Sequence, residues 1–273
     1  MTSKHEPRPG ENLNVSKMPM WMLLARLGKR TLRPGGMELT RQALKLLDVQ
    51  PSDKVVEFGP GVGRTSQLIL SRAPAQYTAI DRDEAAVKQV SGYLKGPQQR
   101  CILGRAQDSD LPDTSVTVVF GEAMLSMETA SHKEQIIKEA ARLLKPGGRY
   151  FIHEVYVEPD DLDDATKSEI GKALSETSRV GMCPLTQSEW RTLLEEAGFE
   201  IRDTIKGPLH LLEPARIFRD EGPLGALRFF TGALRDGTAR RRLLTMRSVI
   251  RRYQDQLSAI GFVAVKPEGE TGG

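Results

Sequence analysis

Short apolar runs alternate with segments of helical periodicity along most of this chain. Runs rich in β-branched and aromatic residues predict seven strands, at residues 54–58, 76–80, 100–103, 116–120 and 149–155, after Phe199, and at 258–265. Apolar residues recur every three or four positions in the helices predicted at 40–47, 62–71, 83–94 and 131–144. This alternation is typical of a parallel sheet covered by helices on both faces. We expect the last strand to run antiparallel beside the sixth.

Two segments interrupt the alternation, at about residues 160–185 and 208–254. The first begins with acids, which we interpret as a solvated helix N-terminus rather than a metal site, because helix N-termini favour negative charge. The second holds an Arg-rich helix with an apolar stripe: Leu243, Met246, Ile250, Tyr253 and Leu257. Packing of this stripe on the core, with a basic outer face, is favoured, and an RNA or anionic-lipid surface is the alternative.

The rest of the chain divides by composition. Residues 1–16 are polar and predict a disordered tail, and residues 268–273 form a short C-terminal tail. Residues 17–50 carry N-terminal helices, the first with Trp21, Leu24 and Leu27 at helical spacing. Residues 51–267 form the main domain, which includes both helical insertions. Asp83 is expected to cap one of its helices, and Lys145-Pro146-Gly147-Gly148 to end another.

Composition excludes several classes of protein. A chain of 273 residues suits one sizeable α/β domain with additions. Its two cysteines suggest neither a disulfide framework nor a metal cage, and no run approaches membrane-spanning length. A net charge of +3 is too small to indicate nucleic acid. These features predict a cytoplasmic protein, monomeric or homodimeric, for which contact with a membrane surface is left open.

The strongest motif follows the first strand, in Glu57-Phe58-Gly59-Pro60-Gly61-Val62-Gly63. Glycines at such a strand-to-helix turn allow positive φ angles and let a ligand approach the main chain, beside the free N–H groups of the helix start. The dinucleotide fingerprint G-x-G-x-x-G would place its third glycine at residue 64, which is arginine, so a nicotinamide dehydrogenase is disfavoured. The second strand leads to Asp81, placed as a ribose-binding carboxylate would be.

The pattern E-x-G-x-G-x-G, followed by Asp81, resembles motif I and the second motif of the class I S-adenosylmethionine-dependent methyltransferases. The resemblance extends over residues 40–205 and the final strand. Within this range it is carried by the segments 104–112, 143–149 and 189–199. Among the branches of the family, the chain is most similar to the one that methylates small molecules. It implies an α/β Rossmann-like fold, with a seven-stranded mostly parallel sheet and a cap of N-terminal helices and insertions. It also implies S-adenosylmethionine as cofactor, and these binding residues: Glu57, Gly59, Pro60, Gly61, Gly63, Asp81, Arg82, Arg105, Ala106, Gln107 and Glu122.

One position departs from the family pattern. An acid often precedes the alanine of the adenine-binding segment, whereas this chain has Arg105 before Ala106. Gln107 or Asp108 then becomes the candidate for the adenine amino contact. The family also often uses its N-terminal helices as a lid, which we expect here for residues 17–50.

Catalytic candidates lie where parallel strands end, since ligands of open α/β sheets bind at the carboxyl edge. His153 is the first candidate for a general base, because imidazole titrates near neutral pH, although a structural histidine is an equal alternative. Glu122 is a second catalytic or cofactor-binding candidate, and His210 in the cap is a third. An apolar or aromatic acceptor is suggested by methionines near the site and by Trp21, although methionine is also an ordinary core residue. No metal is expected.

The sequence thus predicts methyl transfer to the O, N, S or C atom of a small organic acceptor. An RNA or protein methyltransferase is one alternative, disfavoured because Gly121-Glu122-Ala123-Met124 stands where base-methylating enzymes carry Asn-Pro-Pro-Tyr or Asp-Pro-Pro-Tyr. A protein that binds the cofactor without catalysis is another, because binding and turnover need different residues.

Overall fold

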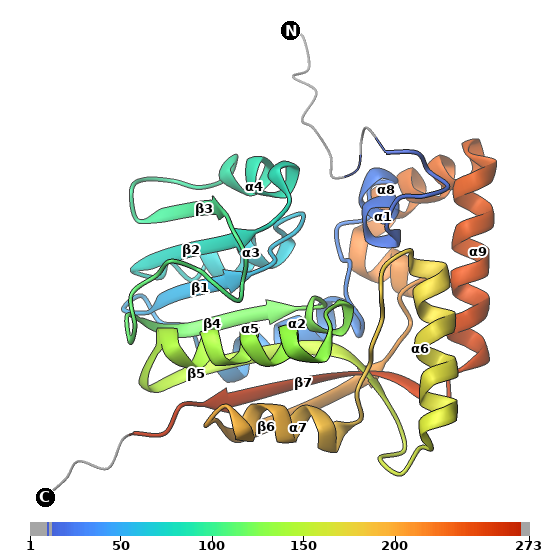
Figure 1. Cartoon of the computed structure of the whole chain (residues 1–273). Coiled ribbons are helices and arrows are strands. Elements are labelled where there is room, and N and C mark those ends of the chain that lie inside the picture. Colours follow the sequence, from blue (N-terminus) through green and yellow to red (C-terminus); the bar gives the residue numbers. More distant parts are fainter. Residues whose placement is uncertain (1–9, 11–12, 269–273) are drawn as a thin grey trace, which may run out of the picture.

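A single twisted sheet organises the chain in the computed structural model, which describes residues 10 and 13–268 (Figure 1). Its strand order is β3-β2-β1-β4-β5-β7-β6, and only β7 runs antiparallel to its neighbours. The strands are β1 Lys54–Phe58, β2 Gln76–Asp81, β3 Gln99–Leu103, β4 Val116–Glu122, β5 Leu144–Val157, β6 Glu200–Pro208 and β7 Leu257–Val265. The predicted seven-stranded, mostly parallel sheet is confirmed, including the antiparallel last strand beside the sixth. Most of the predicted tails, at 1–16 and 268–273, lies outside the described residues.

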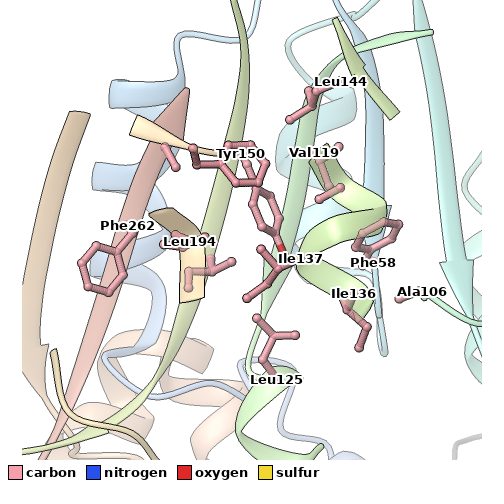
Figure 2. Close-up of a cluster of buried hydrophobic side chains, with 14 of the residues drawn as sticks. Phe58, Ala106, Val119, Leu125, Ile136, Ile137, Leu144, Tyr150, Leu194 and Phe262 are labelled. Atoms are coloured by element: carbon pink, nitrogen blue, oxygen red, sulfur yellow. The ribbon is translucent and has the colours of Figure 1, made fainter. Parts of the chain in front are cut away.

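Helices cover both faces of the sheet. Successive strand residues point to opposite sides, so the apolar strands present side chains that must be buried on each face. Val56, Phe58 and Val119 face α5 (Ala130–Leu143) and α7 (Gln187–Glu196), where Ile137 and Leu194 complete the cluster shown in Figure 2. The alternate strand residues Val55, Val118 and Phe120 face α2 (Gly36–Leu47), α3 (Arg64–Leu70) and α4 (Glu84–Ser91). Burial on both faces explains why these strands read as continuous apolar runs.

The remaining helices form a cap beyond the carboxyl ends of the parallel strands (Figure 1). They are α1 (Met20–Arg26), α6 (Asp164–Ser178), α8 (Pro214–Arg235) and α9 (Gly237–Arg252), and they share an apolar cluster. The predicted stripe of α9 is buried there, but its last member, Leu257, instead begins β7. α8 is kinked at Gly222, whose φ is 73°, because Pro223 follows and lacks an N–H group.

Capping chemistry follows the sequence with one difference. Asp83 accepts a hydrogen bond from the Ala86 N–H at 2.9 Å, and Asp163 caps α6 in the same way, as expected for an acidic helix start. Helix α5 ends at Leu143, before the predicted Pro-Gly-Gly stop. That stop extends β5 instead, because the Gly147 N–H donates to the Lys266 carbonyl oxygen and the Lys266 N–H donates to that of Gly148.

No helix of residues 10 and 13–268 has the length and apolar character needed to cross a membrane. The same residues contain no group of three or more His, Cys, Asp or Glu side chains arranged to hold a metal ion.

Candidate active site

The glycine-rich turn after β1 has the positive φ angles that its sequence predicts. Gly59, Gly61 and Gly63 have φ angles of 62°, 54° and 72°, in the left-handed region that glycine adopts most readily. The two later glycines have different roles. A Cβ atom on Gly63 would lie 2.6 Å from the ring of Tyr93, so Gly63 is needed for packing. A Cβ atom on Gly61 would meet nothing within 4 Å and would project into open space.

Asp81 fixes this turn from the neighbouring strand. One carboxylate oxygen accepts the Gly61 N–H at 3.0 Å, and the other accepts the Asp83 N–H at 3.0 Å. Burial raises the pKa of Asp81, while these two N–H donors act in the opposite direction. The carboxylate therefore lies where β1 and β2 end together, with its remaining lone pairs available to a ligand.

A cavity of about 500 Å³ opens at this edge of the sheet. Nearly all of the residues predicted to bind a cofactor line it: Glu57, Gly59, Pro60, Gly61, Asp81, Arg82, Arg105, Ala106, Gln107 and Glu122. Gly63 does not line it, and neither does Asp108, the alternative to Gln107. The cavity has the size of a small-molecule site.

Glu57 stands at the floor of the cavity in an unusual electrostatic state. Burial raises its pKa to about 7, although the Tyr77 hydroxyl donates a hydrogen bond to its carboxylate and lowers the pKa in part. Near neutral pH this carboxyl group therefore exchanges readily between its neutral and charged forms. A positively charged ligand group beside it would favour the charged form.

Glu122 is held by four side chains, three from the elements α2, α3 and β5 and one from the segment before α2. One oxygen accepts hydrogen bonds from the Thr40 hydroxyl at 2.6 Å and contacts His153 Nδ1 at 2.9 Å. The other accepts the Thr65 hydroxyl at 2.6 Å and pairs with Arg33 at 2.9 Å. Burial would raise the pKa of Glu122, but the charge of Arg33 and the contact with His153 hold it at about 2. A carboxylate so acidic and so fully engaged is a poor general base.

The two histidines predicted as bases lie apart from the cavity. His153 is fully buried and is absent from the cavity lining, and its Nε2 has no hydrogen-bond partner among the described residues. His210 is exposed and does not line the cavity either. The neighbouring Glu154 accepts the backbone N–H groups of Met124, Leu125 and Ser126, at 2.8–3.0 Å. It thereby fixes the loop that brings Met124 to the cavity wall.

Three arginines that no sequence motif assigns to the site also line the cavity: Arg30, Arg33 and Arg64. Arg30 and Arg33 come from the segment between α1 and α2, within residues 17–50, for which the sequence predicts only N-terminal helices that serve as a lid. Arg64 was noted only for interrupting a glycine pattern, yet its buried Nε has no hydrogen-bond partner within the described part of the chain. Desolvation and the nearby charge of Arg30 lower the pKa of Arg64, and the charge of Glu221 offsets this lowering only in part.

Two acids of α8 hold this segment over the cavity. The Glu221 carboxylate accepts the N–H groups of Arg30 and Thr31 at 3.0 Å and 2.8 Å, and Asp220 accepts the N–H of Met37 at 3.2 Å. With Trp21 and Leu32, the segment thus forms one wall of the cavity. Its opening and closing as a lid stays a prediction.

Comparisons with known proteins agree with this geometry. A family model described as a methyltransferase domain matches residues 56–152. An uncharacterized Haemophilus influenzae protein is 32% identical over 216 residues, which cover 78% of this chain and 84% of that protein. The 27-O-demethylrifamycin SV methyltransferase of Amycolatopsis mediterranei is 25% identical over 178 residues, or 62% of either chain.

The fold also has relatives among solved structures. Phosphoethanolamine N-methyltransferase 2 of Haemonchus contortus, solved with phosphomonomethylethanolamine and S-adenosylhomocysteine, superposes with a TM-score of 0.70 at 14% identity. The match covers 90% of this chain and 57% of that one. This chain therefore matches less than two thirds of either named enzyme.

Proposed function

The chain belongs to the class I S-adenosylmethionine-dependent methyltransferases, and we propose that it methylates a small organic acceptor with an apolar or aromatic body. One observation carries the proposal. A single cavity is lined both by residues of the cofactor motifs and by the apolar side chains of Trp21, Leu32, Met124 and Met127. When bound, S-adenosylmethionine supplies an electrophilic methyl group on a positively charged sulphur.

The residues at the motif end of the cavity fit this cofactor. Asp81 offers carboxylate lone pairs of the kind that accept hydrogen bonds from ribose hydroxyls. Gly61 leaves open the space that any side chain would fill. Ala106 and Gln107 would bind the adenine, and Glu57, in its charged form, would neutralise the cofactor's ammonium group. We assign the cofactor to these residues.

The apolar side chains that line the cavity and the named relatives support a small acceptor. By its name, the Amycolatopsis enzyme acts on 27-O-demethylrifamycin SV, and the Haemonchus enzyme was solved with phosphomonomethylethanolamine. Both are small molecules. RNA and protein methylation remain the alternatives, and the segment held over the cavity by α8 argues against a bulky acceptor.

The environment of Glu122 and His153 favours an acceptor atom that is nucleophilic on its own. Glu122 is saturated by four side chains, and His153 does not line the cavity. We therefore assign both residues a positioning role: they hold the cavity wall so that acceptor and cofactor meet in line. A thiolate, an amine or an acidic phenol could then react through alignment, which supplies much of the rate enhancement in such transfers.

Calorimetric titration with S-adenosylmethionine and S-adenosylhomocysteine tests the cofactor site. Asp81→Ala should weaken both affinities by about tenfold or more, because a charge-assisted hydrogen-bond acceptor is lost. Asp108→Ala is the matched control, since Asp108 lies in the same region but does not line the cavity. Equal effects of the two substitutions would contradict the assignment of Asp81.

The acceptor class is tested by incubating the protein and labelled S-adenosylmethionine with small phenols, thiols and amines, with RNA, and with protein. Label in a small molecule supports the proposal, whereas label only in RNA or protein overturns it. Tight cofactor binding without transfer to any acceptor would favour a binding protein without catalysis. A comparison of Gly61→Arg with His153→Ala in cells would then separate cofactor binding from a histidine-dependent function.

A further inference from the structure

The outer surface of the cap leaves a group of large apolar side chains in water. Seven such side chains are exposed among the described residues, and five of them lie on α8 and α9: Phe218, Leu224, Leu227, Leu234 and Leu244. Leu224 is 82% exposed, the largest fraction in this group. Exposed apolar side chains are ordinary when scattered, but a cluster on one surface indicates an interaction site.

Three of these leucines share one face of α8. Leu224, Leu227 and Leu234 fall within about 80° of one another around a helix of 3.6 residues per turn. Phe218 extends the strip, because the centroid of its ring lies 5.8 Å from that of Phe230, a partly buried residue that packs on the cap cluster. The strip therefore runs along the outer side of α8, while the opposite side of the helix packs into the cap through Ala226 and Phe229.

The same helices carry a concentrated positive charge. Residues 214–252 contain ten arginines and three acids, and five of these arginines pair with Glu38, Glu169 or Glu213, whereas the whole chain has a net charge of only +3. Two of the acids, Asp220 and Glu221, are buried against the segment that walls the cavity. Arg228 and Arg235 are exposed beside the leucines, and Arg235 also lines a shallow basic depression at the turn between the two helices.

We propose that this surface, formed by the exposed leucines, Phe218 and arginines of α8 and α9, docks on an anionic phospholipid membrane. Aliphatic side chains at the surface of a basic amphipathic helix insert at the boundary between headgroups and acyl chains, and arginines pair with the phosphates. A symmetric contact between two copies would instead place arginines against arginines. RNA binding would call for aromatic platforms, whereas leucines dominate the strip.

The docking surface adjoins the cavity. The backbone N–H of Arg30, in the cavity wall, donates a hydrogen bond to Glu221 of α8. Gly28 packs closely on Arg228, because a Cβ atom added to Gly28 would lie 3.1 Å from Cδ of Arg228. Likewise, a Cβ atom on Gly232 of α8 would lie 3.1 Å from the side chain of Leu27. A docked molecule would thus hold its cavity wall near the lipid, where an apolar acceptor partitions. This last consequence rests on the proposed function, but docking itself does not.

Co-sedimentation of the full chain with vesicles tests the inference. One set of vesicles is phosphatidylcholine alone, and the other is an equal mixture of phosphatidylcholine and phosphatidylglycerol. The wild-type chain should bind the mixed vesicles at least about tenfold more tightly, and the binding should weaken with salt. L224Q/L227Q and R235E should each lower this affinity by about tenfold or more. L103Q should not, although it replaces a leucine on β3 that is 55% exposed, close to the 59% of Leu227.

Control measurements keep the outcomes distinct. The variants replace exposed side chains, so their thermal unfolding and their S-adenosylhomocysteine binding should match those of the wild type. The vesicle experiment therefore tests membrane docking independently of methyl transfer. Failure of the wild type to bind mixed vesicles overturns the proposal, as does equal binding to neutral ones. A dimer that L224Q/L227Q dissociates, or an oligonucleotide bound in place of vesicles, likewise overturns it and identifies the surface as a self-association or RNA site.

Discussion

Arg33 Nη1 lies 2.9 Å from the carboxylate of Glu122, and both side chains are more than nine-tenths buried. Arg33 belongs to the segment between α1 and α2, whereas Glu122 ends β4. The ion pair therefore joins the N-terminal segment to the carboxyl edge of the sheet, at the wall of the cavity. Because Thr40, Thr65 and His153 contact the same carboxylate, one side chain sets the relative positions of α2, α3, β4 and β5.

Loss of the Glu122 charge should destabilise the protein strongly. E122Q leaves Arg33 buried without its counter-ion, and breaking a buried pair in this way costs about 3–5 kcal/mol of unfolding free energy. Chemical denaturation measures the change. E134Q is the matched control, because Glu134 pairs with Lys138 on the exposed side of α5 and should lose less than about 1 kcal/mol. Similar stability of the two variants would contradict the role assigned to Glu122.

Glu57 should make the ligand-free protein less stable as the pH rises toward neutrality. Burial raises its folded-state pKa from 4.5 to about 7, so the folded protein binds this proton more tightly than the unfolded chain. The unfolding free energy should therefore fall between those two pH values, by at most about 3 kcal/mol, and then stay low. Glu122 contributes the opposite slope only below 4.5, where its stabilisation is lost as pH falls toward about 2.

Denaturation curves at several pH values measure this dependence. E57Q removes the titration, while its amide oxygen still accepts a hydrogen bond from Tyr77. The variant should show a smaller decline in stability between pH 4.5 and about 7 than the wild type, because only Asp81 and Glu154, whose pKa values burial also raises, still contribute to it. If E57Q retains the full wild-type slope, another group is responsible and the state assigned to Glu57 is wrong.

The motifs and the sheet could be predicted because their signals are local. Gly59, Gly61 and Gly63 alternate within one turn, and the apolar runs specify the strands through burial on both faces. The same burial hides which face a strand residue takes, so His153 could not be assigned to the cavity or away from it. The contact of Arg33 with Glu122 joins distant parts of the chain and follows from packing that no periodicity encodes.

Arg64 is expected to bind an anion in the cavity, and the carboxylate of the cofactor is the anion we predict. Its buried Nε has no hydrogen-bond partner among the described residues, and Arg30 and Arg33 add positive charge nearby. R64Q should weaken S-adenosylhomocysteine binding by about tenfold to a hundredfold, because a charge-assisted hydrogen bond is lost. Binding of 5′-methylthioadenosine, which lacks the amino-acid group, should not change.

The control for Arg64 is R72Q, just beyond the other end of α3, where the arginine is exposed and lies outside the cavity. Calorimetry should give wild-type affinities for both ligands. If R64Q weakens both ligands alike, the guanidinium supports the cavity as a whole and does not bind the carboxylate. If it weakens neither, Arg64 has another partner, such as an anionic group of the acceptor.

Gly61 and Gly96 form a pair that separates backbone strain from ligand binding. Their φ angles are 54° and 79°, and a Cβ atom on either would meet nothing within 4 Å. Substitution by alanine should therefore lower the unfolding free energy by a similar amount at both positions, about 1–2 kcal/mol. Only Gly61 lines the cavity, so only G61A should also weaken S-adenosylhomocysteine binding, by about tenfold or more, as its methyl group enters the cofactor's space. Wild-type affinity in G61A would mean that the cofactor does not approach this turn, and the assignment of Asp81 would have to be revised with it.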